Sequence, residues 1–392
     1  MYDEWVLQSS LCKGALEKLH IKTQGDIVQP NNSVSTSSSP PLSFQFTGSG
    51  YEYFKIWIVN LSLTVITLGI YSAWAKVRRN RYFYGNTQLA GDAFEYLANP
   101  ISILKGRLIA VAFFAAWSVS QHIHWAAYAA LTLVFLVLLP WIMVRSLAFR
   151  ARNTAFRNIR FTFRSTYGQA FLNFLLLPIV LGVFTLGLIF PYLLYRQTKW
   201  QIDNSGFGTE KFGFEARVID YYKVFGVMLL IIFALIGAGF LVLGGFVGSL
   251  GLAAGVPGAD GPNIGAGGAA AMLIGFGVAY FVSLLAYLFM FAYVKARISN
   301  IMYYGTHIDG HHFSSDLTAW GVLKVYLINI LGIIFTLGLF IPWAKVNIAR
   351  YMADHVFLIP NGDLNRFVAD QQSAVSAVGE EVGEMFDLDI GL

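Results

Sequence analysis

The fold of this chain is decided by the stretch Ile66-Thr67-Leu68-Gly69-Ile70-Tyr71-Ser72-Ala73-Trp74-Ala75, whose Thr-Leu-Gly tripeptide occurs three times. The other copies are Thr185-Leu186-Gly187 and Thr336-Leu337-Gly338, and each lies near the end of an apolar run, before an aromatic and basic segment. The first and third copies agree further, since Lys55, Asn60 and Trp74-Ala75-Lys76-Val77 recur as Lys324, Asn329 and Trp343-Ala344-Lys345-Val346. A unit that is used three times sets the architecture of the chain.

The composition is that of an integral membrane protein. Hydrophobic residues make up 56% of the chain, charged residues make up 12%, and the mean hydropathy is +0.58. Soluble domains average about 25% charged residues, and a soluble domain of this length could not bury so many apolar side chains. The single cysteine, Cys12, excludes an intramolecular disulfide.

Both ends of the chain are expected to lie outside the membrane domain. Residues 1–43 are largely polar and lack a basic segment followed by an apolar core, so they predict a flexible polar tail rather than a signal peptide. Residues 359–392 are rich in Asp and Glu and predict a solvated acidic tail. The membrane domain is therefore expected over residues 44–358.

Two long intervals, 108–144 and 224–294, contain no Lys or Arg, although basic residues flank both ends of each. Each interval has a polar or flexible break at its centre, at 121–124 and at 251–268. Because basic residues concentrate on the cytoplasmic side of membrane proteins, each interval predicts a helical hairpin with its basic ends inside the cell. The four spanning helices are expected at about 101–120, 125–147, 222–250 and 268–297.

The three Thr-Leu-Gly elements allow two topologies, and their apolar runs cover about 53–75, 168–195 and 318–344. If each run crossed the membrane once, the chain would have seven spans and the basic segment 196–223 would be external, which inverts the positive-inside bias. A re-entrant hairpin at each copy keeps every basic cluster on one face. The motif glycine, with Pro191 and Pro342 downstream, offers a place to break the helix. We favour the re-entrant topology, in which the spanning helices cover the broken backbone.

Alternating aromatic residues flank the first two elements, at Phe44-x-Phe46, Phe94-x-Tyr96, Phe161-x-Phe163 and Phe212-x-Phe214. This alternation is typical of short strands, which must lie on the same side of the membrane if they pair. The other interpretation is an aromatic belt without pairing.

The predicted fold class is an all-α polytopic membrane protein with short strands on its cytoplasmic face. Four spanning helices form two hairpins, at 101–147 and 222–297, and join three repeated elements, at 44–96, 161–214 and 313–357. The protein has seven spans instead if the repeated elements cross the membrane.

Five segments together carry a resemblance to a known family. They are Phe44 to Gly48, 66–75, 81–87, 150–154 and 336–344. Their combination resembles the YjgN family, also described as DUF898, over about residues 43–358. Members of that family are bacterial inner-membrane proteins without an established activity, so the resemblance implies a multi-pass inner-membrane location and no particular reaction. With the charge distribution, it leads us to expect both termini in the cytoplasm.

The first candidate site consists of polar side chains inside the apolar elements: Asn60, Thr67, Thr185, Asn329 and Thr336. An intramembrane Asn is costly unless it bonds a neighbouring helix or faces water. In one interpretation these residues line a ligand site or pathway, as discontinuous helices do in transporters. In the other they satisfy the carbonyl groups that a break in the helix leaves free.

The second candidate site is a basic and aromatic surface on the cytoplasmic face. We expect it to contact anionic lipid headgroups, with each charge contributing about 1 kcal/mol, or to form a defined site for an anionic ligand. The residues are Lys76, Arg78, Arg79, Arg81, Arg150, Arg152, Lys345 and Arg350.

The sequence contains no recognisable catalytic motif, so we predict no enzyme, no catalytic residue and no cofactor. His307 and His311 have i, i+4 spacing but follow a helix end and enclose Gly310, which favours a surface turn over a metal site. No segment resembles a nucleic-acid recognition module.

Two functions remain open. The favoured hypothesis is a transport-type protein (a pore, carrier or lipid-moving protein for a small or anionic solute), because internal repetition and broken apolar elements are typical of transporters. The rival is a non-transporting scaffold or regulator that binds anionic lipid or partner proteins through its basic face. Membrane lipids are the expected partners. The Gly-rich stretch 237–251 would allow close helix packing within a subunit or in a homo-oligomer, and the sequence identifies no small-molecule ligand.

Overall fold

The computed structural model describes residues 40–254 and 266–362. Its contacts divide the chain into two parts, Met1–Ser38 and Ser39–Leu392, and every described residue belongs to the second part. The expected N-terminal tail before residue 40, the centre of the Gly-rich loop and the acidic tail after residue 362 lie outside the described residues.

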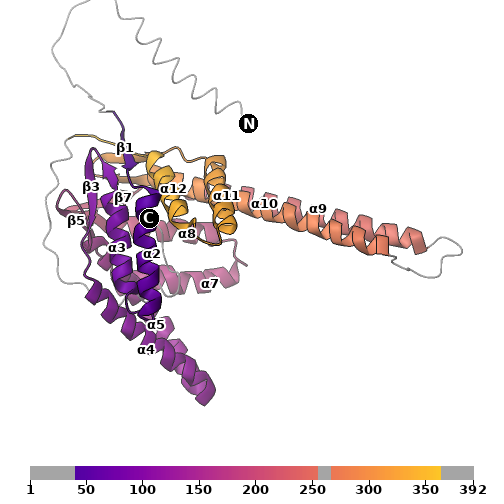
Figure 1. The fold of residues 1–392 in the computed structure, drawn as a ribbon, viewed down its shortest axis with the longest axis horizontal. Coiled ribbons are helices and arrows are strands. Elements are labelled where there is room, and N and C mark those ends of the chain that lie inside the picture. Colours follow the sequence, from indigo (N-terminus) through magenta and orange to yellow (C-terminus); the bar gives the residue numbers. More distant parts are fainter. Residues whose placement is uncertain (1–39, 255–265, 363–392) are drawn as a thin grey trace, which may run out of the picture. The chain divides into compact units, whose positions relative to one another are not determined.

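A strand, two helices and a second strand follow one another five times along the described chain (Figure 1). Unit 1 consists of β1 (Leu42–Phe46), α2 (Gly50–Ile66), α3 (Ser72–Gly85) and β2 (Thr87–Leu89). Unit 2 consists of β3 (Asp92–Tyr96), α4 (Pro100–Ile123), α5 (Trp125–Arg152) and β4 (Thr154–Phe156). Unit 3 consists of β5 (Ile159–Phe163), a first helix in three parts, α8 (Phe190–Asp203) and β6 (Ser205–Phe207). The three parts are α6 (Tyr167–Phe171), the π-helix η1 (Leu172–Leu176) and α7 (Leu177–Phe184).

The last two units contain the longest and some of the shortest helices. Unit 4 consists of β7 (Glu210–Phe214), α9 (Val218–Ala254), α10 (Ala266–Gly305) and β8 (Thr306–Ile308). Unit 5 consists of β9 (His311–Ser315), α11 (Ala319–Phe335), α12 (Ile341–Asp354) and β10 (Val356–Ile359).

The ten strands close an antiparallel barrel in which each strand pairs with its sequence neighbours and β10 pairs with β1. Because each helix pair joins two adjacent antiparallel strands, all five pairs leave the barrel at the same edge. Four two-residue turns lie at the opposite edge. In three of them both turn residues have positive φ, as at Ala90 (52°) and Gly91 (86°), which type I′ hairpin turns require.

Short strands are confirmed at the four aromatic pairs, which lie in β1, β3, β5 and β7. The all-α class was too narrow, because the described residues contain ten strands that close a barrel. The partner strands β2, β4, β6 and β8 have three residues each. A segment of that length is too short to show an alternating pattern.

The helices form a closed ring beyond the barrel edge. Each helix contacts the helices before and after it in the chain, and α12 contacts α2. Side chains near the end of the second helix bind the next unit. Asn300 Nδ2 donates to Leu317 O at 2.9 Å, and Arg350 Nη2 donates to Gly48 O at 2.8 Å. The bond from Arg350 joins unit 5 to unit 1 and so closes the ring.

Each Thr-Leu-Gly copy ends one helix and turns the chain back into the next. The leucines have φ values of 50°, 49° and 50°, and the glycines have φ values of 92°, 85° and 94°. Gly69 N donates to Thr64 O at 2.8 Å, the bond that defines a Schellman helix end, and the other two copies have the equivalent bond. The helix break expected at the motif glycine is therefore present in all three copies, between two strands of the same barrel.

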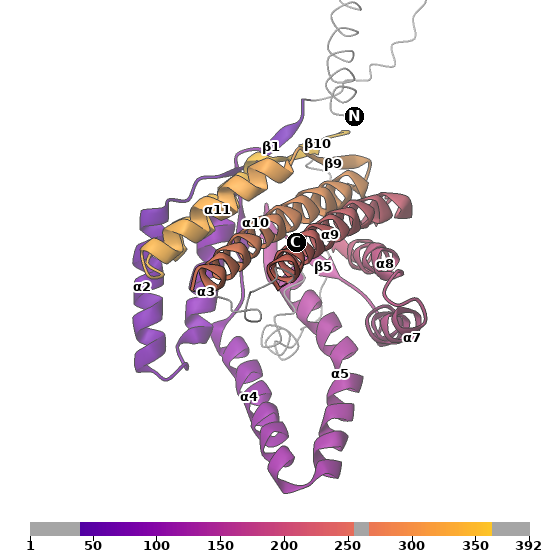
Figure 2. The same cartoon turned by 90° about the vertical axis from the view of Figure 1, so that its right-hand side faces the viewer.

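Five helical segments are long and apolar enough to cross a membrane, by length and composition. They are Pro100–Ile123, Trp125–Arg152, Tyr167–Phe184, Val218–Phe240 and Gly275–Gly305. Four of them lie in α4–α5 and α9–α10, where the sequence predicts spanning hairpins, and the fifth is the first helix of the second Thr-Leu-Gly element, for which we favour re-entrance. Helices α9 and α10 run side by side in Figure 1, and α4 and α5 meet at a tip in Figure 2. The described chain is thus mostly helical, as expected for a polytopic membrane protein.

Candidate functional site

A cavity of about 370 Å³ lies inside the barrel. Its volume falls in the range of about 300–1,000 Å³ that is usual for small-molecule sites. Side chains just fill a barrel of roughly eight strands, whereas ten strands leave internal space. The lining is mostly apolar and includes one phenylalanine from the first strand of each unit: Phe44, Phe94, Phe161, Phe212 and Phe313.

These five residues, the phenylalanine belt, occupy equivalent positions in β1, β3, β5, β7 and β9. The ring centroids of successive residues in the belt are 6.2, 6.3, 6.5 and 6.2 Å apart. The second strands supply a further apolar layer that packs against the belt: Leu89, Phe156, Phe207, Ile308 and Leu358. The barrel therefore encloses an apolar space lined by aromatic faces and edges.

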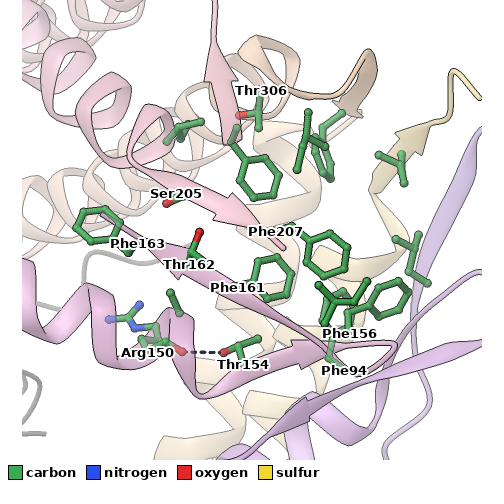
Figure 3. A pocket seen from close by; sticks show the side chains of 18 of the residues that line it. Phe94, Arg150, Thr154, Phe156, Phe161, Thr162, Phe163, Ser205, Phe207 and Thr306 are labelled. Carbon is green, nitrogen blue, oxygen red and sulfur yellow. Dashed lines mark hydrogen bonds between the residues drawn. The ribbon is translucent and has the colours of Figure 1, made fainter. Parts of the chain in front are cut away.

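Several polar lining residues lie where the second helices meet the strands, whereas Thr162 lies within β5 and Arg157 and His311 lie at the turn end of the barrel. Arg150 and Gln201 belong to the ends of α5 and α8, and Thr154, Ser205 and Thr306 are the first residues of β4, β6 and β8. The three hydroxyl groups donate to carbonyls four residues earlier, at 3.0, 2.8 and 2.7 Å. Their oxygen lone pairs remain available as acceptors. In Figure 3, Arg150 and Ser205 lie apart from the gathered phenylalanine rings.

Gln201 brings an unpaired donor to this polar end. Gln201 is 5% exposed, and its Nε2 atom has no hydrogen-bond partner within the described part of the chain. The charged residues among the described lining are Arg150 and Arg157, without a carboxylate. Arg157 Nε pairs with Asp92 Oδ2 outside the lining, at 2.6 Å. The end of the cavity nearest the helices therefore offers hydrogen-bond donors and the positive charge of Arg150, and the second arginine, Arg157 at the turn end, is ion-paired.

The helix faces that line the cavity continue beyond it as a basic surface. Tyr84 of α3 and Tyr303 of α10 line the cavity. Lys76 and Lys295 lie two turns earlier on the same helices, and residues two turns apart share one face of a helix. These lysines therefore lie on the axial side of the ring, beyond the cavity.

Lys345 occupies the equivalent position on α12. The positive charge of Arg79 from unit 1 lies near the Lys345 amine of unit 5. Basic groups from these two units therefore come close together. Positive charge thus gathers around the ring axis on the helix side of the barrel.

The predicted intramembrane asparagines do not line this cavity; they join paired helices. Asn60 Nδ2 donates to Ala75 O at 3.4 Å, and Asn329 Nδ2 donates to Ala344 O at 3.2 Å. Both residues are buried. Their placement favours the interpretation in which they hold the two helices of a pair together.

The predicted threonines Thr67, Thr185 and Thr336 also lie outside the cavity lining. Each hydroxyl donates to the carbonyl four residues earlier, at 2.7, 2.6 and 2.7 Å. Each oxygen also accepts from the amide four residues later, at 2.9, 3.3 and 2.9 Å. The threonines therefore satisfy backbone groups at the turn, which is the second of the two interpretations that the sequence left open.

The structure separates the predicted headgroup residues into several locations. Arg81 Nη2 donates to Ala98 O at 3.5 Å, and Arg350 makes the equivalent bond to Gly48 O, so both join neighbouring units. Arg78 is exposed on α3.

The remaining predicted cations lie closer to the axis or to the strands. Arg150 lines the cavity, and Lys76, Arg79 and Lys345 belong to the basic groups around the axis. Arg152 is partly buried, and its Nη1 atom has no hydrogen-bond partner within the described part of the chain.

Sequence reasoning missed Gln201, Lys295 and the cavity hydroxyl groups. The dipeptides Asn86-Thr87, Asn153-Thr154 and Asn204-Ser205 each mark the junction of a second helix with a strand. Two of these junctions carry cavity hydroxyl groups, at Thr154 and Ser205, so the pattern could have indicated them. At each junction the Asn side chain donates to the carbonyl four residues earlier.

The histidine segment lies in the hairpin between β8 and β9. Its turn residues Asp309 and Gly310 both have positive φ. The described residues contain no group of three or more His, Cys, Asp or Glu side chains that could hold a metal ion.

The fold and the cavity define a class of protein: a helical membrane protein whose helix pairs share one strand barrel with an apolar interior. The chain belongs to the family described as "Bacterial protein of unknown function (DUF898)", whose model matches residues 41–385. It is accordingly an inner-membrane protein of the YjgN type with several apolar helices in contact with lipid.

The chain is also similar in sequence to several curated inner-membrane proteins. The chain is 28% identical over 381 residues to "Inner membrane protein YjgN" of Salmonella typhimurium, an alignment that covers 86% of this chain and 92% of the relative. It is 34% identical over 146 residues to proteins of the same name from Escherichia coli O157:H7 and K12, covering 37% of this chain and 36% of each relative. No solved structure matches the chain.

Proposed function

We propose that this chain is a transport-type protein of the inner membrane that moves an anionic amphiphile from one leaflet of the bilayer to the other by way of the barrel cavity. The observation that carries this proposal is the cavity itself. Its lining is mostly apolar, it carries Arg150, Gln201 and three hydroxyl groups at the end nearest the helices, and Lys76, Lys295 and Lys345 follow along the axis. An amphiphile needs an apolar space and a cationic path, and this arrangement supplies both.

The three Thr-Leu-Gly helix pairs are re-entrant in this proposal. From Lys55 to the end of α2 at Ile66 the helix rises about 17 Å at about 1.5 Å per residue. That distance is little more than half of a hydrocarbon core of roughly 30 Å. The turn leucine Leu68 is 94% exposed, so it needs an apolar surrounding that acyl chains would supply. Both ends of each pair join the same barrel edge, as re-entrance requires.

The barrel and both chain ends lie on the cytoplasmic side in this proposal. Lys55, Lys105, Lys223 and Lys324 are each the sixth residue of a unit's first helix. Since Lys and Arg concentrate on the cytoplasmic side, this lysine level marks the inner headgroup layer. The first and last strands are paired with each other, which keeps residues 42 and 359 on the same side.

Reconstitution tests this function. The full chain is placed in vesicles that contain phosphatidylglycerol with a fluorescent acyl label, and dithionite is added outside to bleach the exposed label. We expect vesicles with protein to lose more fluorescence than empty vesicles, because label from the inner leaflet reaches the outside. Lys345→Met should slow this loss, whereas Lys55→Met on the outer surface should not. Equal loss from protein-containing and empty vesicles would exclude the proposed function.

The scaffold function remains the second candidate because of the outer basic surface. Arg78, Arg145 and Arg297 occupy equivalent exposed positions on α3, α5 and α10, near the lysine level. A belt of exposed cations suits the headgroups of anionic lipids, at about 1 kcal/mol for each charge. If the protein gathers phosphatidylglycerol around itself without moving it between leaflets, the scaffold function is the correct one.

A further inference from the structure

Two polar residues at the helix end of the cavity come from adjacent units. Arg150 and Gln201 occupy the same position in units 2 and 3, one turn before the strand. The equivalent residues of the other units are the apolar Phe83, Met302 and Met352, of which Met302 also lines the cavity. A ligand at this end therefore meets a cation and an amide from units 2 and 3.

The side-chain amide of Gln201 has a donor without a hydrogen-bond acceptor. Its side chain is buried against the cavity, yet Nε2 makes no hydrogen bond within the described part of the chain. Buried donors are nearly always paired, and an unpaired one destabilises the fold. A ligand acceptor atom at this end would remove that cost. The neighbouring guanidinium of Arg150 favours an acceptor that carries negative charge.

The apolar lining of the cavity determines the chemistry of the part of the ligand beyond its head group. The phenylalanine belt and the second apolar layer present hydrocarbon and ring surfaces, and Figure 3 shows Phe94, Phe156 and Phe207 gathered away from Arg150. Burial of an acyl chain against such surfaces favours binding in proportion to the number of methylene groups removed from water. A wholly polar anion would leave this surface without a contact.

We propose that the barrel binds a single-chain amphiphile with an acidic head group, with the chain inside the phenylalanine belt and the head group at Arg150 and Gln201. This inference rests on the proposed function and names its substrate class. The volume of about 370 Å³ suits one chain. A free long-chain carboxylate and a lysophospholipid phosphate share this chemistry.

Binding to the full chain in phosphatidylcholine nanodiscs tests the inference. The probes are radiolabelled dodecanoate, lysophosphatidylglycerol and dodecanol, and binding to empty nanodiscs is subtracted. We expect one or both anionic probes to bind at least tenfold more tightly than dodecanol. The anion that binds identifies the head group as a carboxylate or a phosphate.

Two substitutions separate the head-group contacts from the chain contacts. Arg150→Met should weaken binding of the anionic probe tenfold or more and leave dodecanol binding unchanged. Gln201→Met should weaken the same anion severalfold. The matched controls Arg160→Met and Gln45→Met remove the same groups from exposed positions outside the cavity and should have no effect. If Arg150→Met does not fold, Arg150→Lys should retain anion binding, and Gln201→Met tests the site independently.

The outcomes distinguish this inference from the function on which it rests. Equal binding of dodecanoate, lysophosphatidylglycerol and dodecanol, or unchanged anion binding in both the Arg150 and Gln201 variants, would overturn the head-group site and leave an apolar cavity. Lack of binding by all three probes would overturn the ligand class. Lipid movement in the vesicle assay without such binding would keep the proposed function and reject the inference.

Discussion

The three Thr-Leu-Gly helix pairs and the long pair α4–α5 leave the same barrel edge but end in different chemistry. The tips of the short pairs present Leu68, Leu186 and Leu337, which are 94%, 93% and 95% exposed. The tip of α4–α5 carries His122 and His124 instead, and His124 Nδ1 accepts from the following helix at 3.1 Å. An apolar tip suits the bilayer interior, and a polar tip suits water on the far side.

This difference shows that the barrel and the turn have separate roles: the barrel sets the direction of a helix pair, and the turn sets its length. The barrel fixes the direction of all five pairs, because each joins adjacent antiparallel strands at one edge. The tip sequence then decides how far a pair extends. The Thr-Leu-Gly turn ends the first helix by a Schellman motif, and a proline at the start of α8 and of α12 begins the return helix.

The largest effect is expected from the part that both kinds of pair share. Phe161→Ala removes a ring that contacts Phe94, Phe207 and Phe212, and it should lower the free energy of unfolding by about 3–5 kcal/mol. Phe184→Ala at the tip of unit 3, where the ring is 82% exposed, should change it by less than about 0.5 kcal/mol. Unfolding titrations in mixed micelles measure both. Similar losses would show that the barrel is not the common core.

The second prediction separates the two kinds of tip. Leu337→Lys places a charge where the account puts acyl chains, and it should cost about 3 kcal/mol in a bilayer. His124→Lys at the tip of a spanning pair should cost less than about 0.5 kcal/mol. The measurement is unfolding in phosphatidylcholine vesicles. Equal tolerance of lysine at both tips would remove the distinction between them.

The third prediction concerns the contact between the helices of a short pair. Asn329→Ala removes the donor to Ala344 O and the acceptor for Asn347 Nδ2, so it should destabilise the protein by about 1–3 kcal/mol. Asn347→Ala removes one of these bonds and should cost less. Hydrogen exchange should rise in α11 and α12 while that of α4 and α5 is unchanged. A uniform rise across both kinds of pair would contradict this local role.

The smallest effect is expected at the turn. Thr336→Val keeps the side-chain shape but removes the hydroxyl that bridges Gly332 O and Phe340 N, so it should cost about 1 kcal/mol. The same unfolding titration detects this change. The rate of lipid movement should be unaffected, because Thr336 does not line the cavity. A loss of lipid movement in this variant at unchanged stability would return Thr336 to the pathway.

The sequence predicted the helix pairs better than the barrel, for a physical reason. Long apolar runs and gaps in the basic residues report directly on helices in a bilayer, so α4, α5, α9 and α10 could be located from residues 101–147 and 222–297. The second strand of units 1 to 4 has three residues, and its hydrophobic alternation is too short to detect. Their partners could be found only because each contains two aromatic residues, as at Phe44 and Phe46.

The candidate site was less predictable because it depends on the closure of the barrel. Asn60 and Asn329 stand out in an apolar sequence, yet their partners are carbonyl groups on the paired helix. Gln201 lies in a polar stretch with nothing to mark it, and its burial arises only when α8 is placed at the barrel opening. Arg150 was identified as a basic residue, but its position inside the cavity requires the three-dimensional arrangement.

Cysteine accessibility tests the central claim, that the three short pairs turn back inside the bilayer, most directly. In a Cys12→Ser background, single cysteines replace Leu186 at the tip of α7–α8 and His124 at the tip of α4–α5. A membrane-impermeant maleimide is added to cells whose outer membrane has been opened. The account predicts that the cysteine at 124 is labelled from outside and that the cysteine at 186 is not, because it lies inside the bilayer. Labelling of the cysteine at 186 from the periplasm would show that this pair reaches the far side of the membrane and would contradict the account.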